Sequence, residues 1–167
     1  DPRYPVPQHI CEITNSLIDQ NVLNFDKAAN DDMTLTYHDS CNVARASSMG
    51  GVMGGQFTIP RKIIQTVANN FYDMDDETIK EKTYCCGGGG GLLTDDLMEL
   101  RVKGALPRME ALKHLIEEKG VTHMAAICAI CKSQFSKVFQ YYDLELDQIV
   151  SLHQLVSNAL IMNKKEV

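Results

Sequence analysis

Apolar residues recur along this chain at two spacings, one typical of helices and the other typical of short strands. Where they lie three or four positions apart, they predict amphipathic helices. The predicted helices cover residues 10–23, 60–71, 95–106, 109–119, 135–142 and 152–160. Pro60 suits the first turn of the second helix. Pro107 is expected to kink or end the third helix, and Gly120 to stop the fourth.

Short apolar runs between these helices predict strands at 33–37, 82–85, 123–127 and 148–152. Because strands alternate with helices, the sequence predicts an α/β fold. We expect a small parallel sheet of about four strands with helices on both faces. A stretch at 47–55 holds several glycines and is predicted to be a flexible loop.

The length of 167 residues favours one domain with a substantial core. Residues 1–8 contain three prolines and are predicted to be an extended linker, so the domain is expected over 9–162. No apolar run approaches the roughly 18 residues of a membrane span. The net charge of −6, without a stripe of Lys and Arg, argues against a nucleic-acid partner.

Five of the six cysteines lie at or just beyond predicted strand ends. Cys41 follows the first strand, Cys85 and Cys86 end the second, and Cys128 and Cys131 follow the third. The carboxyl ends of parallel strands meet at one edge of a sheet, where ligands bind. We therefore expect these five thiols to gather there.

A run of five glycines follows the cysteine pair directly. Each glycine loses more backbone freedom on folding than alanine does, so such a run needs a reason. A turn of this kind exposes backbone N–H groups without steric hindrance. We expect Gly87, Gly88 and Gly89 to line a cofactor pocket with these groups.

The residues alone leave several uses of the thiols open. An extracellular disulfide framework is disfavoured, because such frameworks belong mostly to small chains that lack a core. Zinc would suit the pair Cys128 and Cys131, but adjacent cysteines rarely span two corners of a tetrahedron, and five thiols exceed its four ligands. A thioredoxin-type dithiol is disfavoured because no proline follows Pro107 to face the pair. Cys11, on the first helix, is expected to be a buried thiol without a ligand.

Two further uses concern the glycine run. Phosphate binding is disfavoured, because neither the P-loop nor the dinucleotide spacing fits this stretch. An iron–sulfur cluster accounts for the cysteines and the glycines together. Thiolates are its usual ligands, and backbone N–H groups can donate hydrogen bonds to its sulfur atoms.

The cysteine pattern resembles the CCG domain, the cysteine-rich domain of the heterodisulfide reductase B family. The resemblance rests on one cysteine, then Cys-Cys-Gly, then Cys-x-x-Cys, and extends over most of the chain from Thr34 to Leu160. The stretches at 36–42, 85–112 and 123–135 are also similar to the C-terminal part of DsrK-type subunits, from the DsrMKJOP complex of sulfur metabolism. The chain starts with Asp1 and lacks the ferredoxin-type motifs of that family, so we expect a C-terminal piece of a longer subunit.

The resemblance implies a redox domain that holds a noncubane [4Fe–4S] cluster. By position, the ligands would be Cys41, Cys85, Cys86, Cys128 and Cys131. Such domains reduce a disulfide, or the trisulfide of a DsrC-like sulfur carrier, with electrons from a DsrM-like quinol-oxidising subunit. The resemblance thus also implies a cytoplasmic domain that associates with the membrane through its partners. The alternative is a zinc-binding structural or interaction domain of a quinone-linked dehydrogenase complex.

Two histidines near the motifs are candidate proton donors for such a reaction. His38 precedes Cys41 by three residues, and His123 precedes Cys128 by five. A histidine near a strand end is more often a hydrogen-bonded structural residue, so this role is the weaker interpretation of each. Charged residues that flank the motifs are interpreted mainly as surface charges, among them Arg45, Arg101 and Lys132.

Overall fold

The computed structural model describes residues 3–4 and 7–162. The predicted linker at 1–8 therefore lies partly outside the described residues. The α-helices are α1 (Ile10–Asp19), α2 (Cys41–Ala46), α3 (Gly55–Val67), α4 (Met98–Lys119), α5 (Ala129–Val138) and α6 (Leu152–Ala159). The strands are β1 (Leu35–Tyr37), β2 (His123–Ala126) and β3 (Ile149–Ser151). Short 3-10 turns complete the described part: η1 (Lys27–Asn30), η2 (Asp76–Thr78), η3 (Lys80–Lys82), η4 (Asp95–Leu97), η5 (Phe139–Tyr142) and η6 (Leu146–Gln148).

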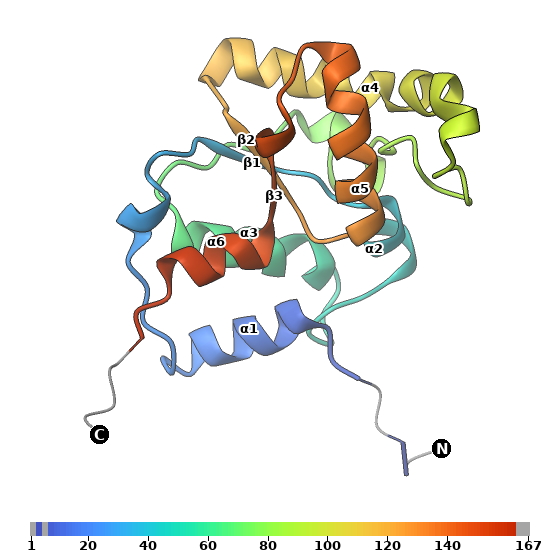
Figure 1. Ribbon diagram of the computed structural model, residues 1–167. Helices are drawn as coiled ribbons and strands as arrows, with labels where there is room; N and C mark the ends of the chain where they lie inside the picture. The colour runs from blue at the N-terminus through green and yellow to red at the C-terminus, as the bar shows by residue number, and fades with distance from the viewer. Residues whose placement is uncertain (1–2, 5–6, 163–167) are drawn as a thin grey trace.

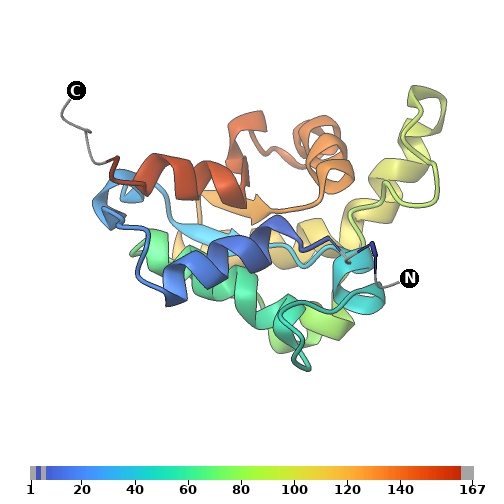
Figure 2. The ribbon, with the colours of Figure 1, turned by 90° about the horizontal axis from the view of Figure 1, so that it is seen from below.

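The three strands form a parallel sheet in the order β1-β2-β3, which confirms the predicted α/β class. Thr36 lies opposite Met124, and Ala125 lies opposite Val150. Helices cover both faces, with α1, α3 and α6 on one side and α4 and α5 on the other (Figure 1). Seen from below, α1 crosses in front of the sheet (Figure 2).

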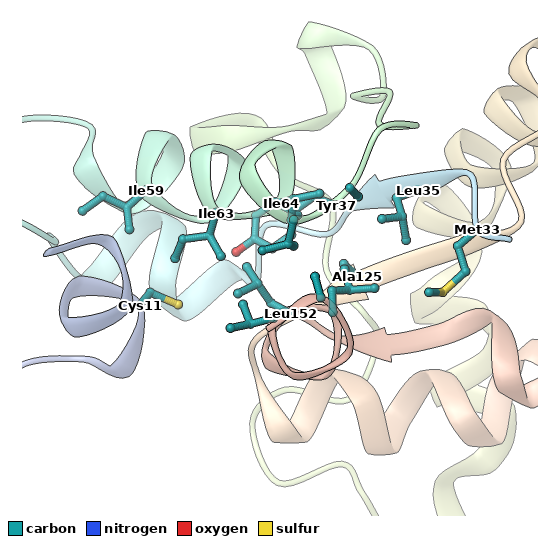
Figure 3. Packing of buried hydrophobic residues seen from close by; sticks show 14 of the residues in the cluster. Cys11, Met33, Leu35, Tyr37, Ile59, Ile63, Ile64, Ala125 and Leu152 are labelled. Carbon is teal, nitrogen blue, oxygen red and sulfur yellow. The ribbon is translucent and has the colours of Figure 1, made fainter. Parts of the chain in front are cut away.

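Each face of the sheet has its own hydrophobic cluster, because neighbouring side chains of a strand point to opposite faces. Ala125 packs with α1, α3 and α6, whereas Met124 packs with α4 and α5. The first cluster also contains Cys11, which is fully buried beside Ile59 and Ile63 (Figure 3). The helical spacing identified the inward faces of α3, α6 and the second half of α4 correctly. It was wrong for α1, where Ile10 and Ile13 are exposed and Cys11 and Thr14 are buried.

The strand predicted at 82–85 does not form. The free edge of β1 is instead occupied by Phe71, which makes an isolated parallel bridge to Leu35. The chain before the cysteine pair takes the 3-10 turn η3, and side chains rather than a neighbouring strand bind its backbone groups. Arg45, for example, donates to the carbonyl oxygens of Glu81 (2.9 Å) and Thr83 (2.5 Å).

Neither proline marks a helix end. Pro60 is in the middle of α3, and Pro107 is in the middle of α4, which continues to Lys119. An internal proline removes one backbone donor and strains the preceding turn. The helices continue because residues beyond each proline are buried, such as Ile64 in α3 and Met109 in α4. Gly120 does end α4, in the left-handed conformation (φ 66°).

A buried ion pair fixes the end of β1 to the rest of the fold. Asp39 is 2% exposed and accepts hydrogen bonds from both terminal nitrogens of Arg61 in α3, at 2.9 and 2.7 Å. Asp73 accepts from the Nε of Arg61 at 2.7 Å. Burial opposes the charge of Arg61, but hydrogen bonds and charge from Asp39 and Asp73 raise its pKa above the ordinary value.

Asp39 also binds the chain that leads to the cysteine pair. Its Oδ2 accepts from the backbone N–H of Lys80 at 2.9 Å, and its carbonyl oxygen accepts from the hydroxyl of Thr83 at 2.7 Å. One residue thus joins the end of β1, helix α3 and the loop at 80–83. This loop takes its position from that aspartate rather than from a strand.

We expect Asp39→Asn to lower the free energy of unfolding by about 3 kcal/mol. Removing one partner of a buried ion pair commonly lowers stability by about 3–5 kcal/mol, and Asp73 still neutralises part of the Arg61 charge. Chemical denaturation measures the change. The matched control is Asp19→Asn, which breaks the exposed pair with Lys62 and should change stability by less than about 1 kcal/mol. Equal effects of the two variants would contradict this role of Asp39.

Candidate metal centre

The parallel sheet brings two cysteine-bearing segments to one edge, as the sequence predicted. Cys41 is the first residue of α2, just beyond β1. Cys128 is the N-cap of α5, just beyond β2. One turn further along α5, Cys131 is 2% exposed. Each of these thiols is therefore placed by the start of a helix that leaves the sheet.

The cysteine pair reaches the same edge without a strand of its own. Arg108 of α4 is fully buried beside this segment, where it donates to the carbonyl oxygen of Thr78 and to the hydroxyl of Thr83 (3.0 Å). Burial lowers the pKa of Arg108 to about 10. Its guanidinium also lies 5.7 Å from the centre of the Tyr84 ring, which stabilises the charge.

A close backbone contact holds the turn after the pair against α4. Gly87 has a φ of +84°, and a Cβ atom at this position would lie 2.5 Å from the carbonyl oxygen of Arg101 and 2.7 Å from the nitrogen of Ala105. Gly104 makes room from the helix side, because its own Cβ would lie 3.3 Å from the Cα of Gly87. Two glycines thus let the loop and the helix backbone meet directly.

Four of the five thiols line one pocket at this edge, those of Cys41, Cys86, Cys128 and Cys131. The pocket holds about 500 Å³ of empty space, part of it open to solvent. Its remaining wall consists of Ser40, Asn42, Leu93, Ile130 and the glycines Gly88, Gly89, Gly90 and Gly91. No charged side chain of the described residues belongs to this wall.

The thiols contact one another as well as the pocket. A hydrogen bond with Cys131, together with burial, raises the pKa of Cys86 to about 12. A hydrogen bond with Cys86 and burial raise the pKa of Cys85. Burial and the neighbouring Cys85 raise the pKa of Cys41. Cys85 is exposed and lies outside the pocket wall, yet it contacts two thiols of the set. The structure therefore brings the five predicted cysteines together.

Backbone N–H groups of the glycine run point at these sulfur atoms. Gly87 donates to the Sγ of Cys85 at 3.3 Å. Gly89 also donates to Cys85, and Gly88 donates to Cys86, which opposes the rise of both pKa values. Donors of this kind favour the thiolate form. The turn thus presents three N–H groups to the adjacent pair.

The first candidate proton donor, His38, is buried and neutral. His38 is completely buried, with its ring edge-on to Phe135 at 4.9 Å. Burial, with a contribution from the charge of Arg108, holds its pKa well below the ordinary value. Neither ring nitrogen of His38 has a hydrogen-bond partner among the described residues. Its low pKa makes it neutral at pH 7, so it is a poor source of protons.

His123 is not brought to the thiols. It begins β2, whereas Cys128 follows the other end of that strand. At about 3.3 Å per residue, roughly 10 Å of strand separates the two ends. The Nδ1 of His123 pairs with the hydroxyl of Thr122 at 2.8 Å, and the residue lines a different pocket, beside Leu112 and Gln148.

Several residues that position the site gave no signal in the sequence. Asp39 and Arg108 resemble ordinary surface charges there, because no helical or strand pattern marks a buried charge. Arg101, interpreted as a surface charge, is 1% exposed and donates to the side-chain oxygen of Gln134 in α5 at 2.8 Å. Only the proximity of Arg101 to the cysteine motif hinted at a role.

Comparison with known proteins identifies the family of this chain. The cysteine-rich domain model named CCG matches residues 35–136, so the chain belongs to the CCG cysteine-rich domain family. It is also similar to two archaeal proteins. The Hdr-like menaquinol oxidoreductase iron-sulfur subunit 2 of Archaeoglobus fulgidus is 43% identical over 154 residues, 92% of this chain. The Hdr-like menaquinol oxidoreductase iron-sulfur subunit of Archaeoglobus profundus is 42% identical over the same share of the chain.

These relatives are much longer than the chain, which spans 26% of the length of each. No solved structure matches it. Among the described residues, none of the helices is long and apolar enough to cross a membrane.

We expect Gly87→Ala to destabilise the protein by more than the left-handed conformation alone requires. That conformation costs a residue with a side chain about 1–2 kcal/mol, and the new Cβ would also collide with the backbone of α4. Gly90→Ala is the matched control, because Gly90 has a φ of +65° but nothing within 4 Å of its Cβ position. Thermal and chemical unfolding compare the two variants. If Gly90→Ala is as destabilising as Gly87→Ala, the contact with α4 is not what requires a glycine.

Proposed function

We propose that this chain is a redox domain that holds a noncubane [4Fe–4S] cluster on Cys41, Cys85, Cys86, Cys128 and Cys131. The observation that carries the proposal is the gathering of these five thiols, four of them around one pocket and the fifth in contact with two of the set. Thiolates are the usual protein ligands of iron–sulfur clusters. Membership of the cysteine-rich family supports the same assignment.

The arrangement of the thiols favours a multi-iron group over a single zinc ion. Among the described residues, no group of three or more His, Cys, Asp or Glu side chains is arranged to hold one metal ion. Five thiols gather at this edge instead, four of them around a pocket of about 500 Å³ that is partly open to solvent. A tetrahedral zinc site needs four donors at about 2.0–2.3 Å from one point. Five thiols exceed the four ligands of a zinc ion and suit a cluster of several irons.

The surroundings of the thiols also fit a negatively charged sulfur-rich group. N–H groups of Gly87, Gly88 and Gly89 face the sulfurs of the cysteine pair. Such donors stabilise thiolates and sulfides and tune the reduction potential. When bound, the cluster would supply single electrons for reductive cleavage of a sulfur–sulfur bond.

We propose a disulfide, or the trisulfide of a DsrC-like sulfur carrier, as the substrate. Cleavage of one S–S bond consumes two electrons and two protons. A disulfide then yields two thiols, and a trisulfide yields a thiol and a persulfide. The chain contributes a pocket open to solvent whose described wall has no charged side chain, so protons can arrive through water. His38 is neutral and His123 lies at the far end of β2, so neither is needed as a donor in this scheme.

The partners follow from the relatives, whose names describe iron-sulfur subunits of Hdr-like menaquinol oxidoreductases. We propose that the chain is part of such a subunit and receives electrons from a DsrM-like quinol-oxidising partner. It would then lie on the cytoplasmic side of the membrane and associate with it through its partner subunits. The rest of the longer subunit would supply the electron path, through the ferredoxin-type motifs that the related subunits carry.

The cysteine assignment can be tested in anaerobically reconstituted protein. We expect Cys86→Ser to abolish or alter the low-temperature EPR signal and to lower the iron content, because a buried ligand is lost. Cys11→Ser is the matched control. Cys11 is equally buried but lies in the cluster of α1, α3 and α6, so its loss should leave signal and iron content unchanged. An unchanged signal in Cys86→Ser, or a lost signal in Cys11→Ser, would contradict the ligand set.

A further inference from the structure

Ser40 occupies the N-cap of α2, directly before Cys41, but does not cap the helix. Its backbone is extended, with φ −67° and ψ 135°, as an N-cap residue requires. A serine in this place commonly accepts a hydrogen bond from an N–H of the first turn, yet the Ser40 side chain makes no such bond. Its hydroxyl is therefore free for another use.

That hydroxyl is buried without a partner, in a residue that lines the thiol pocket. Ser40 is 1% exposed, and its Oγ has no hydrogen-bond partner among the described residues. The residue is part of the pocket wall, with Cys41 and Cys86. Buried hydroxyls are nearly always hydrogen-bonded, because an unpaired one loses its bonds to water. An unpaired donor at the wall of a pocket indicates a group that binds there.

We infer that the Ser40 hydroxyl donates a hydrogen bond to a sulfide of the cluster bound in this pocket and raises the reduction potential of the cluster. The inference rests on the proposed function. No acceptor among the described residues is within reach of this hydroxyl, and a hydroxyl is a single donor that rotates to suit a group bound in the pocket. A donor to sulfur stabilises the more negative reduced form, so the potential rises.

The position of Ser40 is fixed from both sides, as a tuning residue requires. The preceding Asp39 is held by Arg61 and by the N–H of Lys80. The following Cys41 starts α2, and the carbonyl oxygen of Ser40 accepts from the N–H of Ala44 at 2.8 Å. His38 also has unpaired ring nitrogens, but it is not part of the pocket wall. Ser40 is therefore the tuning residue that the geometry selects.

The test is a redox titration of the reconstituted chain, followed by EPR. We expect Ser40→Ala to load as much iron as the wild type but to shift the midpoint potential to a more negative value. Ser40→Thr keeps the hydroxyl and should restore the potential. Ser151→Ala is the matched control. Ser151 is also an N-cap serine without a side-chain capping bond, at the start of α6, but it does not line the pocket.

Each outcome tests either the inference about Ser40 or the proposed function. A wild-type potential in Ser40→Ala with full iron content overturns the inference, as does an equal shift in Ser151→Ala. An equal shift in Ser40→Thr does so too, because the hydroxyl is then not its cause. If Ser40→Ala fails to fold even without iron, as judged by circular dichroism, its hydroxyl has a structural partner and the inference is wrong. If the wild-type chain itself takes up no iron, the proposed function fails instead.

Discussion

Asp39 and Arg61 form a buried ion pair where β1 ends and the thiol-bearing segments begin. A buried charge is tolerated only when it is paired and its remaining hydrogen-bonding positions are filled. Asp39 meets this condition by also binding the backbone of Lys80. The same residue thus sets the end of β1, the orientation of α3 and the path of the loop to Cys85. Without it, the segment that leads to Cys85 would lose its direct link to the end of β1 and would be held by Arg45, Arg108 and Gly87 alone.

The pocket therefore combines two ways of positioning a ligand. The parallel sheet sets the positions of Cys41 and Cys128, since each lies between a strand end and a helix start. The position of the Cys85–Cys86 pair is set instead by side chains that bind the preceding segment, such as Arg108, and by the close approach of Gly87 to α4. Adjacent cysteines need this second way, because in a strand their side chains would point to opposite faces. The irregular backbone lets Cys86 line the pocket while Cys85 contacts Cys86 and Cys41.

The sequence predicts the sheet-derived part of this structure well and the rest poorly. Periodicity located β1, β2 and β3 and placed Cys128 beyond a strand end, because these features are local. It failed at 82–85, where backbone groups bind distant side chains instead of a strand. Pro107, expected to kink or end a helix, does not end α4, because buried residues on both sides of it keep the helix continuous. The unpaired hydroxyl of Ser40 is visible only once its neighbours in space are known.

The central claim is that the five thiols hold a multi-iron cluster rather than a single ion. Elemental analysis of the chain, prepared without oxygen, for iron, acid-labile sulfide and zinc tests it most directly. The account predicts iron and sulfide in equal amounts, with no stoichiometric zinc. Stoichiometric zinc without sulfide would contradict it and would make this chain a zinc-binding structural domain.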